Sequence, residues 1–263
     1  MKVFIKLVFV ALVVSLITVL CTQIKTNKES IDHINKFTAL YKAKHTPYPL
    51  QNFIYLDTYL QAVDTQNNII AGQTLNAASG IAVKGDKGVV YAFTAGHWCS
   101  ADESEYTNAI NSKSGSYPGI RFIVQKRVAF FGQFHIIDSI NSDPINDVCV
   151  ISFRSPYYYK AKKISPARKY PEVGEEIYTS SAPLGMYSHD MRLIFSGYFG
   201  GCQTQEVYCF YTVPGIQGSS GSGVLNKSGD LISILDVSVV DFFQVTGGAK
   251  LESIIDMYDR YVK

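Results

Sequence analysis

Short runs rich in Val, Ile, Phe and Tyr, separated by Gly, Asn, Asp, Ser and Pro, fill the chain from Phe53 onward. The runs recur at the intervals of strands and turns, which is typical of an all-β protein. Within this part of the chain, only Leu251 to Val262 has the spacing of an amphipathic helix. The predicted strands are Tyr59 to Asp64, Gly80 to Lys84, Gly88 to Thr94, Ile120 to Val128, Val148 to Phe153, Glu176 to Ser180, Arg192 to Tyr198, Val207 to Val213, Gly223 to Leu225 and Leu231 to Val240.

A basic stretch bounded by prolines, Lys160 to Pro171, divides these strands into two groups of similar size. We therefore expect two packed β units, over residues 53–158 and 165–250, followed by a closing helix over 251–262. Length alone leaves one large β-sandwich open as an alternative.

The composition limits the class of protein. At 263 residues and 47% hydrophobic content, the chain has ample apolar material for a packed core, which excludes disorder of the whole chain. Its 24 basic and 22 acidic residues give a formal net charge of +2 and form no long runs. This balance gives no electrostatic case for nucleic acid as a partner. No internal repeat is visible, which argues against solenoids and propellers.

The N-terminus has the pattern of a targeting or anchoring segment. Lys2 and Lys6 precede an apolar stretch, Leu7 to Leu20. The stretch is long enough for the core of a signal peptide, and counted from Val3 it reaches the lower limit for a helix that spans a membrane.

We interpret residues 1–24 as a cleaved signal peptide or a retained signal-anchor helix, and residues 25–52 as a helical stalk before a domain over 53–263. Both interpretations predict an exported protein, which is secreted, periplasmic or tethered to a membrane through residues 3–20.

Four of the five cysteines fall in the globular part, and export would permit disulfides among them. Cys202 and Cys209 flank a polar turn between two predicted strands, so a bridge across a hairpin is feasible; two buried thiols are the alternative. The sequence does not determine whether Cys99 and Cys149 form disulfides, or with which cysteines. No Cys or His cluster has the spacing of a zinc site.

Small residues crowd around one serine in the segment Gly215 to Leu225. Gly218 and Gly221 permit backbone dihedrals that other residues rarely adopt, so the chain can turn tightly and present the Ser220 hydroxyl beside converging N–H groups. A flexible linker is the alternative, but this segment passes directly into a predicted strand and turn. Ser220 is therefore the candidate nucleophile.

A serine nucleophile needs a base that is oriented by an acid. Of the five histidines, His97 is distinctive because it ends a hydrophobic strand in small residues that allow an imidazole to be packed closely. Asp147 opens an apolar strand, where its carboxylate can be buried against the imidazole. We interpret Asp138 and Asp143, the other candidates, as loop residues.

Together these segments resemble the motifs of the trypsin-like serine proteases, in the order His, Asp, Ser. The matching segments are Thr94 to His97, Asn146 to Val150 and Gly218 to Gly221. Among subfamilies, Thr212 to Pro214 and Gly221 to Asn226 look closest to bacterial glutamyl endopeptidases and exfoliative toxins, followed by HtrA-type proteases. The resemblance covers the chain from about Tyr59 to its C-terminus.

Two positions depart from the family pattern. Trp98 stands where animal members carry a disulfide cysteine, and Ser219 replaces the usual Asp or Asn before the nucleophile. Neither change removes an atom of the candidate catalytic triad, which is His97, Asp147 and Ser220. Without an acid at 219, however, activation by a freshly cut N-terminal amine that pairs with that carboxylate is excluded.

The resemblance implies two six-stranded antiparallel β-barrels of the chymotrypsin type and a serine endopeptidase that acts on polypeptides. Ser220 would attack the peptide carbonyl, His97 would transfer the proton, and Asp147 would orient the imidazole. The N–H groups of Gly218 and Ser220 would hold the oxyanion, and no metal or organic cofactor is needed. The alternatives are an inactive protease relative used for binding and a membrane-tethered β-sandwich binding module.

The resemblance also indicates a substrate pocket. Its floor position corresponds to Pro214 and one wall position to Leu235, so the pocket offers no charged partner and we expect small or medium apolar side chains before the cut. Asp236 would change this expectation if it faced the pocket, but strand alternation places neighbours 235 and 236 on opposite faces.

Overall fold

The computed structural model describes residues 49–113, 119–189, 191–203, 208–238 and 244–263, all within one compact unit, Pro47–Lys263. The helix predicted within residues 1–24 and most of the stalk predicted over 25–52 lie outside the described residues. Of the helices in the described ranges, none combines the length and the apolar character needed to cross a membrane.

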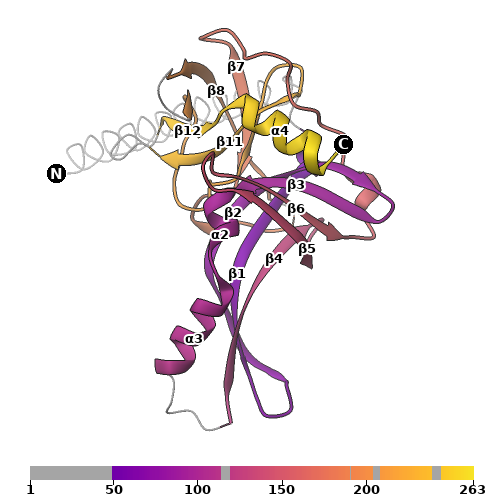
Figure 1. Cartoon of the computed structure of the whole chain (residues 1–263), viewed down its shortest axis with the longest axis vertical. Helices are drawn as coiled ribbons and strands as arrows, with labels where there is room; N and C mark the ends of the chain where they lie inside the picture. The colour runs from indigo at the N-terminus through magenta and orange to yellow at the C-terminus, as the bar shows by residue number, and fades with distance from the viewer. Residues whose placement is uncertain (1–48, 114–118, 190, 204–207, 239–243) are drawn as a thin grey trace, which may run out of the picture. The chain divides into compact units, whose positions relative to one another are not determined.

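Six antiparallel strands of the N-terminal half close into a first barrel, in the spatial order β1-β2-β3-β6-β5-β4 (Figure 1). The strands are β1 Phe53–Val63, β2 Ile69–Asp86, β3 Val89–Ala95, β4 Arg121–Phe130, β5 Gln133–Asp143 and β6 Val148–Arg154. A short 3-10 helix, η1 Leu50–Asn52, precedes β1, and two helices, α2 Gly96–Ser100 and α3 Glu103–Lys113, stand between β3 and β4.

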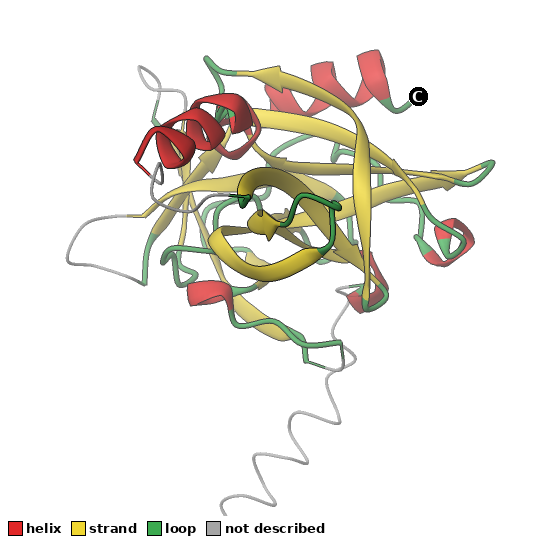
Figure 2. Cartoon of the chain, turned by 90° about the horizontal axis from the view of Figure 1, so that it is seen from below, coloured by secondary structure: helices red, strands yellow, loops and turns green. Residues whose placement is uncertain are grey.

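Six more antiparallel strands close into a second barrel, in the order β10-β11-β12-β9-β8-β7. The strands are β7 Glu176–Ser181, β8 Leu193–Cys202, β9 Tyr208–Tyr211, β10 Gly223–Leu225, β11 Leu231–Ser238 and β12 Thr246–Ala249. The connection between the barrels holds η2 Tyr158–Lys160, and η3 Pro183–Gly185 follows β7. The chain ends in α4 Leu251–Tyr261, and strands dominate the described part (Figure 2).

The closing helix packs on both barrels. Ile254 and Met257 of α4 are buried in a core cluster that contains Phe93 of β3 and Leu225 of β10. The predicted fold of two six-stranded barrels with a C-terminal helix is therefore confirmed. The β-sandwich alternative is wrong, because each sheet closes on itself.

Several elements differ from the sequence prediction; β12 Thr246–Ala249 and the short helix α2, for example, were not predicted. β5 was not predicted, and Asp138 and Asp143, which we interpreted as loop residues, both lie on it. Its sequence shows no long apolar run because no residue of this strand is fully buried. The polar helix α3 was not expected either. β2 runs for 18 residues, far beyond the predicted Gly80 to Lys84, and with β1 it forms a long hairpin at the bottom of Figure 1.

Candidate active site

The sheet of the first barrel brings His97 and Asp147 together. His97 follows the end of β3, Asp147 immediately precedes β6, and the two strands are paired there through Ala95 and Val148. The imidazole Nδ1 lies 2.7 Å from Asp147 Oδ2, and the His97 backbone N–H donates to Asp147 Oδ1 at 2.5 Å. One carboxylate thus contacts both the backbone and the ring of the histidine.

Gly96 makes this approach possible. A Cβ on Gly96 would stand 2.9 Å from Asp147 Oδ1, and the Gly96 N–H donates to the Asp147 carbonyl at 2.9 Å. The carboxylate side chain is only 18% exposed, whereas the imidazole is 49% exposed. The acid is therefore shielded from water while the histidine ring stays accessible to another group.

A disulfide and two hydrogen bonds fix the segment after His97. A disulfide joins Cys99 to Cys149, two positions beyond His97 and Asp147 respectively. The buried Lys126 ammonium donates to the carbonyls of Cys99 and Ala101 at the end of α2. Burial lowers the pKa of Lys126 from its ordinary value. The histidine segment is thus tied to β6 and β4 as well as to β3.

The second disulfide lies away from this cluster. Of the two alternatives left open by the sequence, the structure has the hairpin bridge, Cys202–Cys209, between β8 and β9.

Ser220 occupies a tight turn between β9 and β10. Gly218 and Gly221 on either side have φ values of 90° and 88°, in the left-handed region that glycine adopts without strain. The Ser219 N–H donates to the Ile216 carbonyl at 2.8 Å, which closes the turn. Among the described residues, none accepts a hydrogen bond from the N–H of Gly218 or of Ser220. Two backbone donors therefore stand on either side of the Ser219 peptide.

Ser79 of β2 holds this turn from the first barrel, a role that sequence reasoning did not assign. Its N–H donates to the Ser220 carbonyl and its hydroxyl donates to the Gly218 carbonyl, both at 2.8 Å. The same hydroxyl accepts from the Ala182 N–H at 2.8 Å.

Gly221 places the serine turn beside the histidine strand. A Cβ on Gly221 would collide with the Ser79 carbonyl oxygen and the Thr94 hydroxyl, and would stand 3.0 Å from the Ala95 N. Ala95 is two residues before His97, so the turn that carries Ser220 contacts the end of the strand that carries the histidine.

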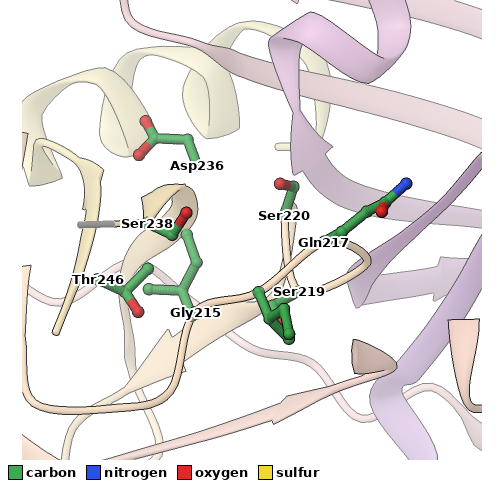
Figure 3. A pocket seen from close by; sticks show the side chains of 9 residues that line it. Gly215, Gln217, Ser219, Ser220, Asp236, Ser238 and Thr246 are labelled. Atoms are coloured by element: carbon green, nitrogen blue, oxygen red, sulfur yellow. The ribbon is translucent and has the colours of Figure 1, made fainter. Parts of the chain in front are cut away.

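A cavity of about 220 Å³ opens next to Ser220. In Figure 3, Ser220 and Gln217 lie on one side of it, and Asp236, Ser238 and Thr246 lie on the other. The complete lining consists of Gly215, Ile216, Gln217, Ser219, Ser220, Leu235, Asp236, Ser238 and Thr246.

The lining differs in part from the pocket expected from the sequence. Leu235 lines the cavity, whereas Pro214 is not among its described lining residues. Asp236 lines it as well, against the expectation from strand alternation, because a register shift between Leu235 and Val237 interrupts the pairing with β12. Both carboxylate oxygens of Asp236 are nevertheless buried. Burial, with the charge of Asp236 as a smaller contribution, raises the pKa of Tyr211.

Within the described ranges, no cluster of three or more His, Cys, Asp or Glu side chains has the arrangement of a metal site. The groups that the structure gathers in this region are the Ser220 hydroxyl, the His97 imidazole, the Asp147 carboxylate and backbone N–H groups.

The sequence matches no protein-family model, and no curated protein matches it. Solved structures do match. A serine endoprotease from Yersinia pestis superimposes with a TM-score of 0.55 at 15% identity, over 80% of this chain and 62% of that chain. This chain thus spans less than two thirds of the Yersinia protein.

The Rv3671c protease from M. tuberculosis in its active form gives a TM-score of 0.54 at 10% identity, over 81% of this chain and 82% of that one. An inactive mutant form of Rv3671c gives 0.54 at 9% identity, over 81% and 87%. The predicted resemblance to the trypsin- and chymotrypsin-like serine proteases is confirmed at the level of the fold.

Proposed function

We propose that this chain is a serine endopeptidase. The Ser220 hydroxyl attacks the carbonyl carbon of a peptide bond while His97 takes its proton, which gives a tetrahedral oxyanion. His97 then returns the proton to the leaving amine, and an acyl-enzyme remains on Ser220. Water, deprotonated by His97, hydrolyses this ester and regenerates the serine.

The observation that carries the proposal is the two-point contact between His97 and Asp147, at 2.7 and 2.5 Å, beside a serine turn packed against Ala95. Asp147 favours the imidazole tautomer that carries its proton on Nδ1, so the other ring nitrogen is left to act as the base. The N–H groups of Gly218 and Ser220 stabilise the oxyanion. The structural neighbours are named as proteases, which supports the same reaction class.

The pocket and the disulfides support two narrower proposals. The buried position of the Asp236 oxygens argues against pairing with a substrate cation, so we expect an uncharged side chain before the cut, packed on Ile216 and Leu235. Sequencing of cleavage sites in a denatured protein mixture tests this; enrichment of Lys or Arg contradicts it. Two disulfides fit an exported domain, because such bonds persist in oxidising compartments.

An active-site fluorophosphonate tests the function directly. It should label the native chain on Ser220 and leave Ser220→Ala unlabelled, while the matched Ser219→Ala variant keeps measurable labelling and peptide hydrolysis. A folded native chain that neither reacts with the probe nor cleaves peptides would instead indicate an inactive protease relative used for binding.

A further inference from the structure

The connection between the two barrels carries a strong positive charge. Its residues 155–171 contain five cations and no acidic residue; the cations are Lys160, Lys162, Lys163, Arg168 and Lys169. All five residues are exposed. Among the described residues, none of them has an acidic partner in an ion pair. A chain with a formal net charge of only +2 therefore concentrates positive charge on this connection.

Two segments that are distant in the sequence add to this charge. A cavity of about 410 Å³ is lined by four cations from the connection, from β2 and from the end of the chain after α4; these are Lys84, Lys163, Arg168 and Lys263. Asp259 also lines the cavity, and it pairs with Lys263 at 3.1 Å. The Lys84 ammonium donates to the Val262 carbonyl at 3.0 Å, which fixes this cation at the cavity wall. The cavity therefore suits a negatively charged group.

Tyrosines stand beside the cations on the same connection. The short helix η2 contains Tyr158 and Tyr159, and Tyr159 is 66% exposed. The Lys160 ammonium lies over the rings of Phe131 and Tyr157, at 4.8 and 5.1 Å from their centroids. Side chains with an apolar body and a polar end are characteristic of the boundary between lipid and water. The connection thus combines the basic and aromatic residues that an anionic lipid surface attracts.

The chain enters the described domain at the same place. The Asn52 side chain donates to the Lys162 carbonyl at 2.6 Å, and the Lys162 N–H donates back to Asn52 Oδ1 at 3.2 Å. Residues 21–48 separate this point from residues 3–20, which the sequence predicts as a signal or anchor segment. A segment of that length spans about 30–40 Å, as a coil or as a helix. A retained anchor would hold the connection within reach of a membrane, which favours lipid over an acidic protein as the partner.

We propose that the connection and the cavity beside it dock on an anionic lipid surface, with lipid phosphate groups at Lys163 and Arg168 and the Tyr159 ring at the boundary with water. Each cation near such a surface strengthens binding about fivefold, and salt screens the attraction. Docking would give the domain a fixed orientation on the membrane. The inference does not depend on the proposed peptidase function, because neither His97 nor Ser220 takes part in it.

A fluorescent side chain at position 159 tests the contact in the full chain. Trp98 is the only tryptophan of the sequence and is 1% exposed, so Tyr159→Trp adds an indole whose emission can be followed. Phosphatidylcholine vesicles with a quenching spin label on the headgroup are prepared with and without about one third phosphatidylglycerol, which supplies the negative charge. We expect quenching on the anionic vesicles, at least about threefold weaker quenching on the neutral ones, and loss of this difference at about 1 M salt.

Matched variants in the Tyr159→Trp background locate the charge. Lys163→Gln/Arg168→Gln should lower the docking constant on anionic vesicles, obtained from the quenching, about 25-fold, which is about fivefold for each cation. Arg121→Gln/Lys227→Gln removes the same charge from exposed positions elsewhere and should lower the constant less than about threefold. Fluorophosphonate labelling should be equal in the two variants, because neither change touches the candidate active site.

Each other outcome decides between the proposals. Quenching that is equal on neutral and anionic vesicles, absent on both, or weakened equally by the two double variants overturns lipid docking. Binding of poly-glutamate that depends on Lys163 and Arg168, without quenching on vesicles, also overturns it and indicates an acidic polypeptide as the partner. A native chain that fluorophosphonate does not label, but that docks on anionic vesicles through these cations, overturns the endopeptidase and supports the docking surface.

Discussion

Replacing Gly221 by alanine tests whether the serine turn depends on close packing against the first barrel. Gly221 has φ of 88°, and an added Cβ would collide with the Ser79 carbonyl and the Thr94 hydroxyl. The left-handed conformation costs an alanine about 1–2 kcal/mol. Overpacking in a closed site adds about 1–3 kcal/mol. We therefore expect Gly221→Ala to lower the free energy of unfolding by about 2–5 kcal/mol.

Gly88 provides a matched control, because it has the same φ of 88° and an added Cβ would meet no atom within 4 Å. Gly88→Ala should cost only the conformational part, about 1–2 kcal/mol. Urea denaturation measures the free energy of unfolding of both variants. The labelling rate with a fluorophosphonate reports whether the serine turn keeps its conformation. Equal destabilisation of the two variants, or an unchanged labelling rate in Gly221→Ala, would refute the packing argument.

Three further predictions concern the surroundings of the site. Asp147→Asn should lower turnover by roughly four orders of magnitude, by favouring the wrong imidazole tautomer, whereas Asp138→Asn should not; steady-state kinetics decides between them. The Cys99→Ala/Cys149→Ala variant opens a loop with a sequence separation of 50, and urea denaturation should show a loss of about 4 kcal/mol; a loss under about 1 kcal/mol would contradict the entropic estimate. Burial lowers the pKa of His135 from its ordinary value of 6.5, so the unfolded chain binds more protons below that pH and stability should fall as the pH drops through it. The urea midpoint should depend less on pH between about 7.5 and 5.5 in His135→Gln, and an identical slope would exclude this histidine as the cause.

Most strands of both barrels and the closing helix could be predicted because their buried faces require apolar residues at regular spacing; β12, four residues with two glycines, could not. The candidate triad could be predicted because each member stands in a local frame of small or apolar residues. β5 could not, since its residues are exposed or half-buried and carry no apolar run. The helix α3 was missed for a related reason: it is held to β4 through polar groups, such as the Thr107 hydroxyl that accepts from the Val124 N–H.

Contacts that depend on how strands align in the folded sheet also could not be predicted from the sequence. The Cys99–Cys149 bond follows from the pairing of β3 with β6, which no local pattern specifies. The position of Asp236 depends on an irregularity in β11, and strand alternation fails wherever an extra residue enters the ladder.

The hydrogen bonds of Ser79 tie the assembly of the candidate site to the order in which the chain is made. The first barrel is synthesised first, and its Ser79 has no serine turn to hold until the second barrel has been completed. A nascent chain therefore passes through most of its synthesis without an assembled candidate site. Conversely, any separation of the barrels would release the turn from Ser79, and the proposed peptidase activity should end with it.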